Sequence, residues 1–166
     1  KKIRPLLTLI SGLAVGGQLD NLIFPSAAIE LLHNFSLVHD DIMDNDDTRR
    51  GQPTVHVKWD VGTAILTGDG LLGFAYRKLL DTPNIRTNRL AVLFTEAMLE
   101  ICEGQALDKI FETRTEVSEK SYFAMIAKKT ARLMQLACEM GAIVGTGTGS
   151  EIRALAQERT WGIVSV

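Results

Sequence analysis

Hydrophobic residues recur every three or four positions along most of the chain, which is the spacing of an amphipathic helix. No stretch alternates between hydrophobic and polar residues in the way of a half-buried strand. We therefore predict an all-α fold, an antiparallel helix bundle in a single domain spanning residues 1–166. The predicted helices are Pro5 to Val15, Pro25 to the acidic residues near position 40, Asp60 to Leu80, Asn88 to Phe111, Ser118 to about Met140, and a last one from Ser150 or Glu151 to Val166.

Glycine and proline mark the boundaries of these helices. Gly16 and Gly17 are expected to end the first helix, and Pro25 is expected in the first turn of the second. Residues Asn45 to Val57 include a glycine and a proline and predict a loop. The glycine- and threonine-rich stretch from Gly141 to Gly149 predicts a flexible connection.

Composition and charge narrow the class of protein. The 166 residues are 46% hydrophobic and 23% charged, which is ordinary for a globular domain with its own core. A net charge of −2 and the lack of a basic stripe argue against a nucleic-acid partner. We expect no membrane span and a cytoplasmic location, because no apolar run is long enough and no signal peptide opens the chain. Cys102 and Cys138 are expected to be buried free thiols.

Five carboxylates within eight residues close the second predicted helix. Asp40 and Asp44 are four residues apart and share one helix face, with Asp41 beside them. Their repulsion, strengthened by the negative end of the helix dipole, requires solvent or a cation. Oxygen ligands favour Mg²⁺, which commonly shares the phosphate oxygens of a substrate. Arg49 and Arg50 follow with forked donors suited to phosphate, so the sequence predicts a magnesium–diphosphate site.

The acidic residues have two other interpretations. An acidic run is most often a solvated face. Asp44-x-Asp46-x-Thr48 also imitates the first ligands of a calcium loop, but that loop requires glycine at its sixth position and glutamate at its twelfth. This chain has Arg49 and Val55 there, which excludes the calcium loop.

Several short motifs resemble, in order and spacing, those of the trans-isoprenyl diphosphate synthases, or polyprenyl synthetases. They are Lys1-Lys2-Ile3-Arg4-Pro5, Glu30-x-x-His33-x-x-x-Leu37-x-His39, Asp40-Asp41-Ile42-Met43-Asp44, Arg49-Arg50-Gly51, Gly104-Gln105-x-x-Asp108, Lys129-Thr130-Ala131 and Gly141-Ala142. The resemblance implies a helix bundle of the isoprenoid synthase type. The family also has helices before Lys1 and a second aspartate-rich motif expected beyond Val166. The bundle is therefore expected to be incomplete at both ends, and residues 1–166 alone are expected to be inactive.

The resemblance implies a prenyltransferase that condenses an allylic diphosphate with isopentenyl diphosphate and releases diphosphate. It implies dependence on Mg²⁺, with Mn²⁺ as an alternative metal, and a homodimer, for which the long apolar helix Asn88 to Phe111 offers a surface. By resemblance, Asp40, Asp41 and Asp44 bind the metal. The other implied ligands are Arg49 and Lys129 for the allylic diphosphate, Lys1, Arg4, His33 and Arg50 for isopentenyl diphosphate, and Thr130 and Gln105 for the developing carbocation.

The length of the product is expected to depend on residues just before the aspartates. Leu32, Phe35 and Ser36 would line the tunnel for the growing hydrocarbon. A large Phe35 beside a small Ser36 resembles archaeal-type short-chain enzymes, which make C20 or both C15 and C20 products. Ideal helix geometry places Ser36 under Asp40, so the choice of Phe35 as the floor rests on the resemblance. An ordinary core role for Phe35 is the alternative.

Two other functions share part of this pattern. A non-catalytic subunit of a heteromeric synthase would keep the fold, but it would have little need of the intact first aspartate motif. A terpene cyclase would share the metal chemistry without needing the isopentenyl diphosphate ligands Lys1, Arg4 and His33. Individual residues also have plainer interpretations: a solvated terminus for Lys1, a core histidine for His33, and a polar notch between helices for Gln105.

Overall fold

The computed structural model describes the backbone of residues 2–83 and 86–164, and the side chains of these ranges up to residue 157. Within them the predicted all-α fold is confirmed, and a single short antiparallel hairpin pairs Thr48 with Pro53 and Arg49 with Gln52. The elements are α1 (Ile3–Ala14), α2 (Leu19–Met43), β1 (Thr48–Arg49), β2 (Gln52–Pro53), α3 (Val55–Lys58), α4 (Val61–Leu80), α5 (Thr87–Glu112), α6 (Glu119–Ile126), the π-helical segment η1 (Ala127–Ala131), α7 (Arg132–Val144) and α8 (Gly149–Val164).

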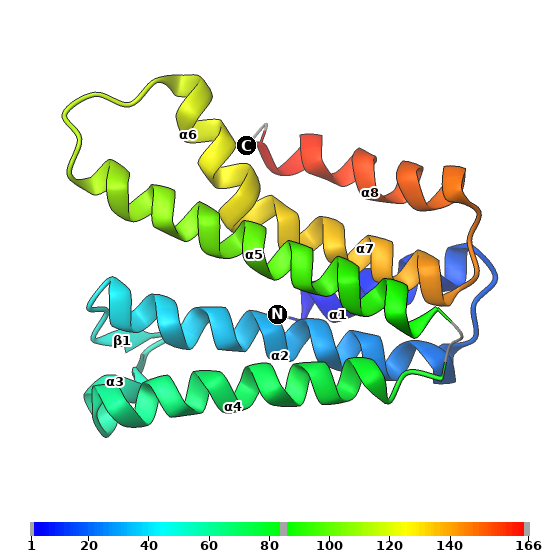
Figure 1. Ribbon diagram of the computed structural model, residues 1–166, viewed down its shortest axis with the longest axis horizontal. Helices are drawn as coiled ribbons and strands as arrows, with labels where there is room; N and C mark the ends of the chain where they lie inside the picture. Colours follow the sequence, from blue (N-terminus) through cyan, green and yellow to red (C-terminus); the bar gives the residue numbers. More distant parts are fainter. Residues whose placement is uncertain (1, 84–85, 165–166) are drawn as a thin grey trace.

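Successive long helices run in opposite directions (Figure 1). Helix α2 lies beside α4, and α5 passes above them and contacts η1 and α7. Helices α2 and α5 run in the same direction, so their C-terminal ends lie at the same end of the bundle (Figure 1). The hairpin and α3 follow α2 at that end. This arrangement brings the acidic end of α2 near the polar end of α5.

Helix α7 forms the centre of the core, and none of its residues is exposed. It packs against α1, α2, α5 and α8, and Leu136, Met140 and Ile143 are almost fully buried. Helix α1 approaches it so closely that a side chain on Gly141 would collide with the carbonyl of Thr8. The predicted flexible stretch is therefore wrong for its first four residues, which are helical and buried. Residues 145–148 alone form the connection to α8.

Three further expectations are corrected. Helix α2 already begins at Leu19, so Pro25 lies inside it, where burial of the proline keeps the helix intact despite the missing N–H group. The expected loop over Asn45 to Val57 contains β1, β2 and the start of α3. Cys138 is buried as expected, but Cys102 is exposed. None of the helices in the described ranges combines the length and the hydrophobicity that crossing a membrane requires.

Candidate active site

A cavity of about 350 Å³ lies between α2, α5 and η1. Its residues from α2 and α5 are mainly apolar in the middle of each helix, as with Leu32, Met98 and Ile101. Toward the C-terminal ends of both helices they become charged, with Asp40 on α2 and Lys109 on α5. Because these two helices run in the same direction, the cavity has an apolar part and a charged end.

Two lysines stand opposite the two aspartates that share a face of α2. Lys129 Nζ lies 3.7 Å from Asp40 Oδ1 and 2.5 Å from Asp108 Oδ2. Lys109 Nζ lies 3.3 Å from Asp44 Oδ1 and 2.8 Å from Glu112 Oε2. The repulsion predicted between Asp40 and Asp44 is thus balanced by two cations from across the cavity.

The charges at this end shift the pKa of several groups. Burial raises the pKa of Asp40, the charge of Asp44 adds to the increase, and Lys129 opposes it. Burial alone would lower the pKa of Lys129, but the hydrogen bond to Asp108 and the charges of Asp40 and Asp108 outweigh it, so this pKa ends raised. Hydrogen bonds to Glu112 and Asp44 likewise raise the pKa of Lys109. Both lysines are therefore cations at neutral pH.

The π-helical segment η1 places Lys129 and Thr130 on the wall of the cavity. Its last turn widens so that the N–H of Arg132 donates to the carbonyl of Ala127, five residues earlier. Helix α5 touches this segment at Gly104, where an added Cβ atom would lie 2.5 Å from the backbone nitrogen of Lys129. The glycine therefore lets α5 approach the backbone that carries Lys129.

Asp41 behaves differently from its neighbours. Its side chain is 7% exposed, and one of its oxygens accepts a 2.5 Å hydrogen bond from Arg49 Nε. Neither residue is among those that line the cavity. The hairpin β1–β2 holds Arg49 in this position, and Arg50 occupies its turn with a positive φ of 54°. The metal role of Asp41 and the diphosphate roles of Arg49 and Arg50 stay predictions.

On the α1 side the cavity is bordered by Arg4 and His33. Burial, followed by the positive charge of Arg4, lowers the pKa of His33 to about 4, so the imidazole is neutral at pH 7. Burial also lowers the pKa of Arg4, against the raising effect of Glu30. Arg4 Nε and Gln105 Nε2 are buried and have no hydrogen-bond partner among the described residues. Unpaired buried donors beside a cavity suit a ligand rich in acceptor oxygens. Lys1 lies outside the described residues.

Comparison with known proteins identifies the chain. A model of the polyprenyl synthetase family matches residues 1–160. The chain belongs to the polyprenyl synthetase family. It is 49% identical over 158 residues to the short chain isoprenyl diphosphate synthase of Methanothermobacter thermautotrophicus. The aligned region covers 93% of this chain and 48% of that relative. It is also 42% identical over 159 residues to the geranylgeranyl diphosphate synthase of Methanosarcina mazei. That aligned region covers 95% of this chain and 49% of the relative.

Solved structures agree with this assignment. The geranylgeranyl pyrophosphate synthetase of Pyrococcus horikoshii superposes with a TM-score of 0.90 at 44% identity, over 93% of this chain and 48% of that one. The enzyme of Geoglobus acetivorans does so with a TM-score of 0.94 at 38% identity, over 99% of this chain and 54% of that one. The sequence therefore spans about half the length of these relatives. The fold is that of the isoprenoid synthases.

The metal predicted for this polyprenyl synthetase can be compared with its donor set. No group of three His, Cys, Asp or Glu side chains in the described part of the chain is arranged to hold a metal ion. Asp40 and Asp44 nevertheless offer two carboxylates one helical turn apart. Mg²⁺ commonly takes one or two carboxylates and completes its shell with water and substrate phosphate, so these two residues fit it.

The predicted tunnel residues of the polyprenyl synthetase also lie on the cavity wall. Leu32, Phe35 and Ser36 all border it. The ring of Phe35 lies 4.7 Å, centroid to centroid, from that of His39. Ser36 Oγ donates to the carbonyl of His33, so its polar atom is satisfied within α2. Lys109 is a charged residue at this site that the sequence analysis missed, although its position four residues after Gln105 would have placed it on the same helix face.

Proposed function

We propose that the protein is a prenyltransferase that condenses an allylic diphosphate with isopentenyl diphosphate and releases diphosphate. We propose Mg²⁺ as its metal, Mn²⁺ as an alternative, and C15 to C20 chains as its products. One observation carries the proposal. A largely apolar cavity ends at Asp40, Asp44 lies one helical turn further along the chain, and a lysine from across the cavity pairs with each carboxylate.

The charged end of the cavity suits the departure of a diphosphate. Asp40, Asp44 and, by resemblance, Asp41 would hold Mg²⁺, which when bound neutralises the leaving diphosphate. Lys129 borders the cavity beside Asp40 and offers a further cation to the same anion. Arg49 would join it after leaving Asp41.

The opposite polar corner suits the second substrate. Arg4, His33 and Arg50 would bind isopentenyl diphosphate, with Lys1 added by resemblance. Arg4 Nε has no partner in the described structure, and a neutral His33 still donates one hydrogen bond. Gln105 and Thr130 border the space between the two anion sites and would place oxygen atoms beside the cationic carbon.

The apolar part of the cavity has its own role. A carbocation formed next to water would be trapped by it, so the reacting carbon must be kept dry. Leu32, Phe35 and Met98 supply walls that exclude water and accept the hydrocarbon. No side-chain nucleophile is needed in this reaction.

The test is to replace each aspartate in the full-length protein. Asp40→Ala and Asp44→Ala are each expected to lower condensation by about 10²-fold or more, as the loss of a group that stabilises transition-state charge does. Incorporation of radiolabelled isopentenyl diphosphate measures the effect. Asp47→Ala is the matched control, because Asp47 is exposed in the loop after α2. Near-normal turnover of either site variant at saturating Mg²⁺, with unchanged helicity, would contradict the metal assignment.

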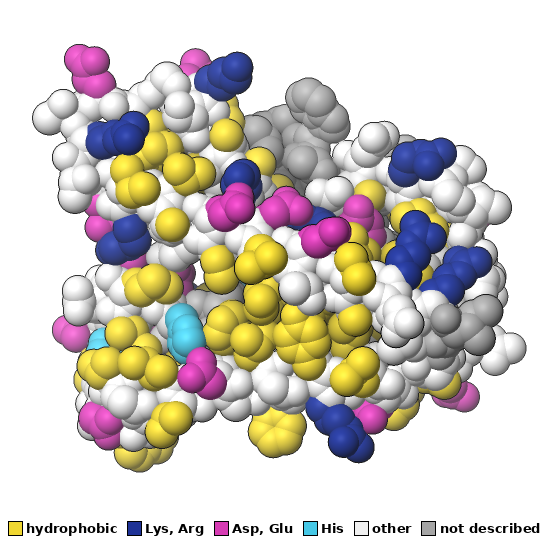
Figure 2. Space-filling view, in the orientation of Figure 1, with side chains coloured by type: hydrophobic (Ala, Val, Ile, Leu, Met, Phe, Trp, Pro, Cys, Tyr) yellow, Lys and Arg dark blue, Asp and Glu magenta, His cyan; other side chains and the backbone are white. Residues whose placement is uncertain are grey.

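We also propose that the protein is a cytoplasmic homodimer. Support comes from exposed hydrophobic side chains on α4 and α5, including Leu66, Phe74 and Val92, which are 73%, 64% and 58% exposed. Figure 2 shows hydrophobic side chains gathered between these two helices on one face of the molecule. A free thiol at Cys102 fits a reducing compartment.

A further inference from the structure

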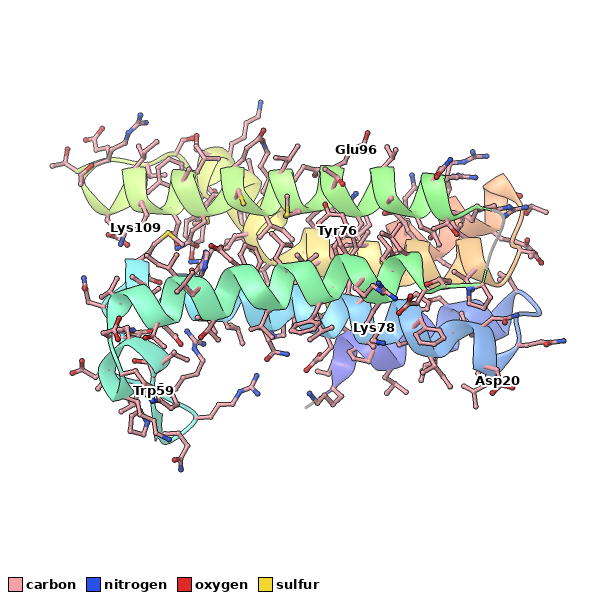
Figure 3. All side chains as sticks on the ribbon, turned by 60° about the horizontal axis from the view of Figure 1, so that its bottom comes forward. Asp20, Trp59, Tyr76, Lys78, Glu96 and Lys109 are labelled. Atoms are coloured by element: carbon pink, nitrogen blue, oxygen red, sulfur yellow. The ribbon has the colours of Figure 1, made fainter. Side chains whose placement is uncertain are left out.

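Lys109 links the two helices that border the charged end of the cavity. It leaves α5 on the side facing α2 and α4 (Figure 3). Its Nζ atom lies 3.3 Å from Asp44 Oδ1 on α2 and 2.8 Å from Glu112 Oε2 on its own helix. The side chain is 35% exposed and borders the cavity. Lys109 is thus a cation held between two carboxylates, one on its own helix and one 65 residues away in the chain.

The contact with Asp44 occupies a carboxylate oxygen that the proposed function gives to a metal. Asp44 forms an ion pair with Lys109, but the lysine lies closer to Glu112. An ammonium group and a divalent cation cannot both approach the same oxygen closely, because like charges repel at this range. Lys109 can leave Asp44 and keep Glu112, so its displacement does not leave the lysine without a partner.

Lys129 makes a similar bridge but is placed differently. It lies 3.7 Å from Asp40 and 2.5 Å from Asp108, so its stronger bond is to α5. Lys109 is closer to its aspartate on α2, at 3.3 Å against the 3.7 Å between Lys129 and Asp40.

We propose that Lys109 is a positioning residue that holds Asp44 in the metal-free protein and competes with the divalent cation for it. The proposal rests on the proposed function, since it takes Asp44 as a metal ligand. It predicts that the lysine weakens metal binding in the absence of substrate and turns to Glu112 when the metal binds. The lysine thereby limits how readily the site fills before a diphosphate arrives.

Binding of Mn²⁺ to the full-length protein without substrate tests this, with free Mn²⁺ followed by electron paramagnetic resonance. Lys109→Met is expected to lower the Kd for Mn²⁺ by about twofold to fivefold, the range that matches a partly exposed ion pair. Lys109→Arg keeps the competing charge and is expected to bind like the wild type. Lys128→Met is the matched control, because Lys128 pairs with Glu103 on α5 at 2.6 Å instead of with an aspartate of α2.

A double-mutant cycle with Asp44→Asn separates this inference from the proposed function. If Lys109 acts through Asp44, Lys109→Met has no effect on Mn²⁺ affinity in the Asp44→Asn background. Unchanged or weaker Mn²⁺ binding by Lys109→Met, or an equal gain in Lys128→Met, overturns the role of Lys109. If Asp40→Asn and Asp44→Asn bind Mn²⁺ as tightly as the wild type, the metal assignment itself fails instead.

Discussion

At the scale of single residues, Phe35 combines two contacts. It packs against the hydrophobic core and also borders the cavity, where its ring meets that of His39. The two interpretations drawn from the sequence, floor of the tunnel and ordinary core residue, are therefore compatible in space. They differ in what a smaller side chain would do.

Phe35→Ala is expected to lengthen the products. The space vacated would join the cavity, and each further methylene buried there stabilises the longer chain by about 0.8 kcal/mol. Ser36→Phe is expected to shift the products toward C15. Chromatography of the dephosphorylated products measures both. If the product distribution of Phe35→Ala is unchanged while stability falls by about 3–5 kcal/mol, Phe35 is a core residue only.

His33 gives a prediction about pH. Its pKa is about 4 in the folded protein against the usual 6.5, so between these values the unfolded chain binds more protons. The free energy of unfolding therefore decreases as the pH falls from about 6.5 to about 4. His33→Gln removes this contribution and is expected to lose less stability over the same window. Urea unfolding at pH 7 and pH 5 compares them, and an identical loss in both proteins would argue against a buried neutral His33.

Residue spacing predicted part of the site. Asp40 and Asp44 lie on one face because four residues make about one helical turn. The pairing of Asp41 with Arg49 and of Asp44 with Lys109 did not follow from spacing, because each depends on how separate elements meet. The hairpin that turns Arg49 back onto Asp41 is only two residue pairs long. Strands this short show no recognisable alternation of hydrophobic and polar residues.

At the scale of elements, the periodicity of the hydrophobic residues located the helices well. The predicted Asp60 to Leu80 and Asn88 to Phe111 agree within a residue with Val61–Leu80 and Thr87–Glu112. The failures have local causes. Pro25 and Gly141 are breakers by propensity, but both are buried in packed helices, and tertiary contacts outweigh propensity.

The contact of α5 with η1 gives a prediction at this scale. Gly104→Ala is expected to lower the free energy of unfolding by about 1–3 kcal/mol, since the added methyl would press on backbone rather than on a flexible side chain. Activity is expected to fall with it, because that backbone carries Lys129. Gly73→Ala is the matched control. It lies on α4 with open space around it, so alanine is expected to stabilise the helix by about 0.5–1 kcal/mol. Thermal unfolding of both variants decides, and a neutral Gly104→Ala would show that the two elements can separate freely.

At the scale of the whole molecule, the exposed hydrophobic surface of α4 and α5 bears on assembly. Leu66 and Phe74 are among its most exposed members. Apolar area of this kind is common at the interfaces of symmetric dimers. Helix α5 also lines the cavity, so a partner on this face would support one wall of the site.

Phe74→Arg is expected to convert the proposed dimer into monomer, because a buried unpaired charge opposes association. Light scattering after gel filtration measures the mass. Tyr122→Arg on α6 is the control, being also exposed but on a different element. A dimer that survives Phe74→Arg would move the interface to another face.

The π-helical turn between α6 and α7 means that this helix holds one residue more than a regular helix of the same length. Deleting a single residue from Ala127–Ala131 would allow an unbroken α-helix with better hydrogen bonds. The flanking segments would keep nearly the same relative orientation, because the wide turn accommodates the extra residue. Lys129 and Thr130, which lie inside the wide turn, would then change direction and leave the wall of the cavity. The extra residue lets one continuous helix contribute both to the hydrophobic core and to the site.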